Sequence, residues 1–77
     1  MDNTIIKPGL YRHFKGGLYR VIAECIIADS NPGTVGVVYQ NEAGDLFVRS
    51  LVNWIQPVVR FEDGTEIMCE RFRYISA

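Results

Sequence analysis

The chain has 77 residues, of which 48% are hydrophobic, 12% aromatic and 22% charged, and its formal net charge is −1. This composition excludes a disordered tail and a collagen-like repeat, and the apolar runs are too short for a transmembrane helix. The first residues also lack the basic start and long apolar stretch of a signal peptide. We therefore expect one small cytoplasmic domain over residues 1–77, with residues 1–7 as a flexible arm.

Short runs of β-forming residues, separated by turn residues, are the dominant pattern of the chain. They predict strands at residues 10–14, 18–28, 34–40, 46–51, 58–61 and 66–75. The segments between them carry turn signals at Gly16-Gly17, residues 29–33, residues 41–45 and Asp63-Gly64. Residues 51–56 fit either a short helical turn or a loop that carries Trp54 onto the sheet. We therefore expect an all-β fold, a small SH3-like antiparallel barrel of five or six strands.

The long second strand shows which of its faces we expect to be buried. Alternate residues of a strand point to the same side. One side of residues 18–28 is wholly apolar and is predicted to face the core; it comprises Tyr19, Val21, Ala23, Cys25 and Ile27.

A chain of this length is marginally stable by itself and usually needs a disulfide, a metal or a partner subunit. Only two cysteines and one histidine are present, which makes a zinc site within one chain improbable, and we expect no metal and no cofactor. A disulfide between Cys25 and Cys69 is one alternative, but two free thiols are favoured. Self-association remains, and we expect a homo-oligomer.

Catalytic chemistry is thinly represented. His13 is the only residue whose usual pKa suits proton transfer near neutral pH. A lone histidine in a strand is more often structural, and no nucleophile elbow or phosphate-binding loop is present. An enzyme that acts through His13 is therefore the minority interpretation.

Aromatic and basic residues alternate over residues 11–20, and similar groups recur near Arg49 and Arg71. Rings stack on bases, and a guanidinium group holds phosphate by two hydrogen bonds. If these groups converge, they form a ligand site; the alternative is that the rings fill the core and the arginines lie on the rim. The candidate ligand-binding residues are Tyr11, Arg12, His13, Lys15, Tyr19, Arg49, Trp54 and Arg71.

These residues also carry a resemblance to a known family. The pattern Gly9-x-Tyr11-x-His13-Phe14-Lys15-Gly16-x-x-Tyr19-x-Val21 is similar to the opening signature of small bacterial and phage proteins called domain of unknown function 1653. Val38-Tyr39, Phe47-Val48-Arg49 and Arg71-Phe72 match further pieces in order, so that the resemblance covers residues 8–74. It implies a compact SH3-like β fold without established chemistry.

The chain departs from this family pattern at three places. A polar run that family members carry after the second strand is replaced by residues 28–33. Ser50 stands where a proline commonly follows the Val-Arg pair, and Asn53-Trp54 stands where Met-Phe follows. Any site that the polar run builds is therefore in doubt here, and a remaining site would depend on the N-terminal hairpin, Arg49 and Trp54.

These observations favour a non-catalytic binding module for an anionic, nucleotide-like ligand. A phage-type protein that sequesters host signalling nucleotides is a special case of this hypothesis. One alternative is a protein–protein interaction module of the SH3-like type, since such domains bind peptides on aromatic surfaces. Another is a weak binder of RNA or single-stranded DNA, although the net charge of −1 disfavours nucleic acid.

Overall fold

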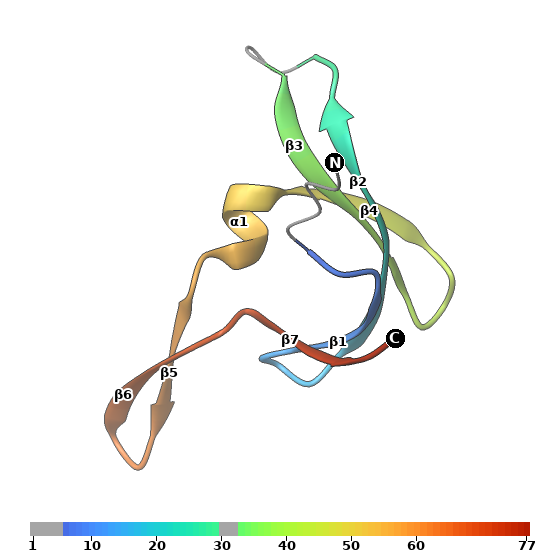
Figure 1. The fold of residues 1–77 in the computed structure, drawn as a ribbon. Coiled ribbons are helices and arrows are strands. Elements are labelled where there is room, and N and C mark those ends of the chain that lie inside the picture. The colour runs from blue at the N-terminus through green and yellow to red at the C-terminus, as the bar shows by residue number, and fades with distance from the viewer. Residues whose placement is uncertain (1–5, 30–32) are drawn as a thin grey trace.

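The computed structural model describes residues 6–29 and 33–77, which form seven strands and one short helix (Figure 1). The elements, in chain order, are β1 (Gly9–His13), β2 (Leu18–Ile27), β3 (Thr34–Asn41), β4 (Leu46–Ser50), α1 (Leu51–Ile55), β5 (Val58–Glu62), β6 (Thr65–Cys69) and β7 (Phe72–Ser76). Five strands form an antiparallel sheet in the order β4-β3-β2-β1-β7, and β5 and β6 form a separate hairpin. The predicted all-β class is confirmed, and of the two alternatives for residues 51–56 the structure has the short helical turn.

The five-stranded sheet does not close into the expected barrel. Strands β4 and β7 lie at its two ends and are not hydrogen-bonded to each other, and β5 and β6 pair only with one another. The β5–β6 hairpin instead projects away from the sheet (Figure 1). The described part of the chain measures 42 × 27 × 25 Å. Its radius of gyration, 13.7 Å, exceeds the value of about 11.5 Å expected for a compact chain of this length.

The prediction of one last strand over residues 66–75 is wrong, because the chain changes sheets in the middle of this segment. β6 pairs with β5, whereas β7 pairs with β1. The Phe14 backbone N–H donates to the Arg71 carbonyl at 2.9 Å, immediately before β7 begins. Both halves have β-forming sequences, so their alternation gave no sign of the break at Glu70 and Arg71.

The prediction that five alternate residues of β2 share one buried face is also wrong. Val21 pairs with Tyr39, but Ala23 pairs with the adjacent Val38, so Ile22 is an extra residue in the ladder. Such a β-bulge reverses the side to which the following residues point. Val21 is therefore buried in the core, whereas Ala23 is exposed.

The predicted hairpin turn between β5 and β6 is confirmed. Asp63 and Gly64 have φ angles of 52° and 77°. Positive φ at both central residues is typical of the tight turn that suits the right-handed twist of two antiparallel strands. Asp-Gly accepts this conformation easily, which explains why β5 and β6 remain paired beyond the edge of the main sheet.

The core is built mainly from aromatic rings that α1 and β7 bring together over the sheet. The Trp54 and Phe72 rings stack at 3.7 Å between centroids with an interplanar angle of 3°. Tyr11 and Tyr39 meet the indole edge-on at 5.5 and 5.1 Å. The buried hydrophobic residues are Tyr11, Val21, Val37, Tyr39, Trp54 and Phe72.

Three further expectations concern the cysteines, the N-terminal segment and the membrane. Cys25 and Cys69 are free thiols, as predicted. Residues 1–5 of the expected arm and residues 30–32 of the expected turn lie outside the described residues; Ile6 packs against the core. Among the described residues, no helix has the length and hydropathy needed to cross a bilayer.

The start of α1 depends on Ser50, and this dependence can be tested. Its hydroxyl accepts a hydrogen bond from the Asn53 backbone N–H at 3.2 Å, and α1 carries the buried Trp54. Loss of such a cap typically costs about 1 kcal/mol. We therefore expect Ser50→Ala to lower the free energy of unfolding by about that amount, measured by urea titration of Trp54 fluorescence. Ser76→Ala, at an exposed position at the end of β7, is the control, and an equal effect of both variants would contradict the capping role.

Candidate functional site

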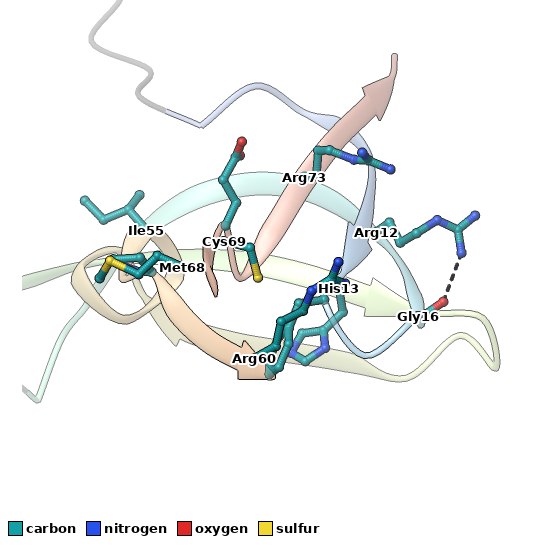
Figure 2. Close-up of a pocket in the computed structure, with 11 residues that line it drawn as sticks. Arg12, His13, Gly16, Ile55, Arg60, Met68, Cys69 and Arg73 are labelled. Carbon is teal, nitrogen blue, oxygen red and sulfur yellow. Dashed lines mark hydrogen bonds between the residues drawn. The ribbon is translucent and has the colours of Figure 1, made fainter. Parts of the chain in front are cut away.

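A cavity of about 680 Å³ lies between the β5–β6 hairpin and the sheet edge formed by β1 and β7 (Figure 2). Three segments that are far apart in the sequence contribute to its walls. Its lining residues are Arg12, His13, Phe14 and Gly16 from the first hairpin; Ile55, Pro57 and Arg60 from α1 and β5; and Met68, Cys69, Glu70 and Arg73 from β6 and β7.

The charge of the cavity wall is predominantly positive. Arg12 and Arg73 are direct partners across β1 and β7, and both are exposed. Like charges in such a pair repel each other. Arg60 adds a third guanidinium group from the hairpin and forms an ion pair with Glu62, while Glu70 is the one carboxylate among the described lining residues. An anion in this cavity would therefore relieve the repulsion between the arginines.

The three arginines of the cavity wall differ in whether their guanidinium groups already have a hydrogen-bond or ion-pair partner. Arg12 Nη1 donates to the Gly16 carbonyl at 3.1 Å, as the dashed line in Figure 2 shows. Within the described part of the chain, the Arg73 guanidinium has no hydrogen-bond or ion-pair partner. All of its donors are thus available to a ligand.

His13 lies at the end of β1, and its ring is held by neighbouring rings. The centroid of the imidazole is 4.6 Å from that of Phe14 and 4.9 Å from that of Phe72. Gly16, with φ of 104°, closes the following turn by donating its N–H to the His13 carbonyl at 2.7 Å. The Lys15 N–H donates to Nδ1 of His13 at 3.1 Å. A neutral ring that accepts at Nδ1 carries its proton on Nε2, so this atom is a hydrogen-bond donor.

The surroundings of His13 also determine its charge. Burial lowers the pKa of the imidazole, and the positive charges of Arg49, Arg71 and Lys15 lower it further. Because the usual pKa is already about 6.5, the neutral form of His13 predominates at pH 7. In this state it can donate one hydrogen bond but contributes no charge to the site.

A second group of cations lies beside the aromatic core. The Arg49 guanidinium carbon is 5.4 Å from the centroid of Phe72 and 6.0 Å from that of Tyr39. Its Nε donates to the Tyr39 hydroxyl at 3.3 Å, and its Nη1 donates to Asn53 Oδ1 at 2.5 Å. These contacts fix Arg49 against the rings. Nε of Arg71, by contrast, is buried without a hydrogen-bond partner in the described residues.

The structure separates the eight predicted ligand-binding residues into three groups. Arg12 and His13 line the cavity. Lys15, Arg49 and Arg71 surround His13 but are not in the cavity wall, and Tyr19 packs edge-on against His13 at 6.1 Å. Tyr11 and Trp54 are only 6% and 3% exposed and form part of the buried core, outside the cavity wall.

The sequence analysis does not select Arg60, and it includes Arg73 only in the group of rings and cations around Arg71. A single strand over residues 66–75 does not predict the pairing of Arg73 with Arg12. Arg60 and Glu70 lie in separate segments whose approach depends on the path of the hairpin. Arg12 and Arg73 are brought together by the pairing of β1 with β7, and a prediction of that pairing is what would have identified them as neighbours.

A comparison with known families matches residues 9–74 to the model described as "Protein of unknown function (DUF1653)". The chain belongs to this family. The match runs from the start of β1 to Tyr74 in β7, so both walls of the cavity lie within the DUF1653 region. No curated protein and no solved structure shows significant similarity to the chain.

The electrostatic environment of His13 gives a prediction about its titration. We expect an NMR titration to give a pKa below 6.5 for His13, and Arg49→Gln to raise it because one neighbouring positive charge is removed. Since the unfolded chain binds this proton more readily, the contribution of His13 to stability is present above pH 6.5 and is lost as the pH falls through the folded pKa. Arg20→Gln serves as the control, because Arg20 does not contribute to the shift of the His13 pKa. An unchanged pKa in Arg49→Gln would refute the assignment.

Proposed function

We propose that this DUF1653 protein is a non-catalytic binding module whose cavity holds a small anionic, nucleotide-like ligand. The observation that carries the proposal is the approach of Arg12, Arg60 and Arg73 around one cavity from three different strands. A guanidinium group matches the geometry of phosphate oxygens and keeps its charge at all physiological pH values. The unpartnered Arg73 is the strongest candidate to contact a phosphate group.

The size and the other walls of the cavity suit the same ligand class. Its volume of about 680 Å³ lies within the range of about 300–1,000 Å³ that is typical of small-molecule sites. Phe14 and His13 provide flat rings on the wall beside Arg12, and rings of this kind stack on bases. Nε2 of the neutral His13 can donate a hydrogen bond to a phosphate or carbonyl oxygen. A phage-type protein that sequesters signalling nucleotides is one role that such binding would serve.

A protein-interaction module is the second candidate, and one observation favours it. Large apolar side chains are exposed on the hairpin and on β4, including Phe61 at 69% and Leu46 at 63%. Exposed apolar groups of this kind are typical of interaction surfaces. Weak binding of RNA or single-stranded DNA remains a third alternative, and oligonucleotides therefore belong in the same set of test ligands.

Calorimetry tests the proposed ligand class directly. We expect ADP-ribose or a cyclic dinucleotide to release or absorb heat on mixing with the protein. Loss of a charged hydrogen bond costs about 1.5–3 kcal/mol, so Arg73→Gln should weaken binding by about 10- to 150-fold. Lys7→Gln is the control, because Lys7 is also an exposed basic residue but does not line the cavity.

Two results would contradict the proposal. One is the absence of a binding signal with every nucleotide at a protein concentration near a millimolar. The other is equal binding by wild type and Arg73→Gln, which would place the ligand elsewhere. Binding of oligonucleotides in preference to mononucleotides would favour the third alternative instead.

A further inference from the structure

The β5–β6 hairpin exposes an apolar face flanked by acidic residues. Val59, Phe61 and Met68 are 48%, 69% and 69% exposed. Val59 pairs with Met68, and Phe61 pairs with Glu66, so these side chains share one side of the hairpin. Glu66 lies on this side as the partner of Phe61, and Asp63 lies in the turn, so these two carboxylates make the face acidic. Glu62 lies on the opposite side of the hairpin, where it forms an ion pair with Arg60.

This hairpin lacks the covering that a two-stranded unit normally needs. It projects from the body of the protein (Figure 1) and shares no strand pairing with the five-stranded sheet. A two-stranded hairpin is marginally stable in water unless another element packs against it. A chain of this length also gains from a partner subunit, since its own core is small. The exposed apolar face is therefore a candidate interface.

Positive charge, opposite in sign to that of the hairpin, lies on the outer face of the five-stranded sheet. In the ladder of β1, β2 and β7, Arg12 pairs with Arg73 and with Leu18, while Arg20 pairs with Leu10. Direct partners point to the same side, so the three arginines share one face with two leucines. β1 and β7 contain no acidic residue. We call this surface the arginine face; it comprises Leu10, Arg12, Leu18, Arg20 and Arg73.

We propose that the hairpin of one copy docks on the arginine face of a second copy and that the two chains form a two-fold symmetric dimer. The acidic, apolar hairpin and the basic, leucine-containing face are complementary in charge and in polarity. Each chain carries both surfaces. In a two-fold symmetric dimer the hairpin of each copy therefore contacts the arginine face of the other copy, and both surfaces are covered in both copies. Within one chain the cavity separates the hairpin from Arg12 and Arg73, and Arg20 lies outside that cavity.

The dimer and the proposed ligand are argued from different observations, but Arg12, Arg73 and Met68 contribute to both. Arg20 belongs to the arginine face alone, and Phe61 and Glu66 belong to the hairpin alone. Substitutions at these three positions therefore test the dimer without altering the lining of the cavity. Measurements in the absence of added nucleotides keep the two questions apart.

Sedimentation velocity of the full chain is the experiment. We expect a mass of twice 8.8 kDa for the wild type at concentrations of about 0.1–0.5 mM, and dissociation as the salt concentration rises. Phe61→Ser and Arg20→Glu should each weaken association by about tenfold or more. Combining Arg20→Glu with Glu66→Lys should recover part of the loss, because the charges are then exchanged across the interface.

Control variants and one further measurement make the result decisive. Ile26→Ser removes a similarly exposed apolar side chain, and Asp29→Lys changes an exposed acid, both away from the proposed surfaces; neither should alter association. Circular dichroism reports whether each variant is folded, and Arg20→Glu tests the dimer even where Phe61→Ser disturbs the hairpin. A wild type with a mass of 8.8 kDa throughout, or folded variants that associate as the wild type does, would overturn the inference.

Discussion

The stack of Trp54 on Phe72 is the contact on which most of the structure depends. The two rings lie 3.7 Å apart and nearly parallel, and Tyr11 and Tyr39 pack against the indole. Trp54 belongs to α1 and Phe72 begins β7, so the stacked pair holds the chain on both sides of the β5–β6 hairpin. The two ends of the hairpin are therefore held in place, and their position determines the shape of the cavity between the hairpin and the sheet.

Phe72 also connects the core with the charged groups. The centroid of the Phe72 ring lies 4.9 Å from that of the His13 ring and 5.4 Å from the guanidinium carbon of Arg49. Burial by these rings and the nearby cations explain the lowered pKa of His13. The ring that completes the core thus also positions a histidine in the cavity wall.

Much of the fold could be predicted from local signals. Asp63-Gly64 and Gly16 form the expected turns, and the segment that carries Trp54 forms a helical turn. Two features could not be predicted because they depend on which strands pair. The bulge at Ile22 reverses the faces of β2, and the change of sheets at Glu70 and Arg71 divides a segment with continuous β-forming character.

The site was harder to predict for a related reason. A tyrosine or tryptophan beside an arginine has the same local pattern whether it stacks on a ligand or fills a core, and only burial distinguishes the two, as for Tyr11 and Trp54. The position of Arg12 among the rings of the first hairpin marks it as a candidate ligand residue. Arg73 belongs to a similar group of rings and cations, but its place beside Arg12 depends on the pairing of two strands almost the whole length of the chain apart.

A double-mutant cycle on the stacked pair tests the central claim most directly. Trp54→Leu, Phe72→Leu and the double variant keep apolar side chains at both positions but remove the stacking, and urea unfolding followed by circular dichroism gives the free energy of each. The account predicts a coupling of about 0.5–1.5 kcal/mol between the two positions, beyond the loss caused by each single change. Effects that add within about 0.3 kcal/mol would contradict it, because the two rings would then stabilise the protein independently.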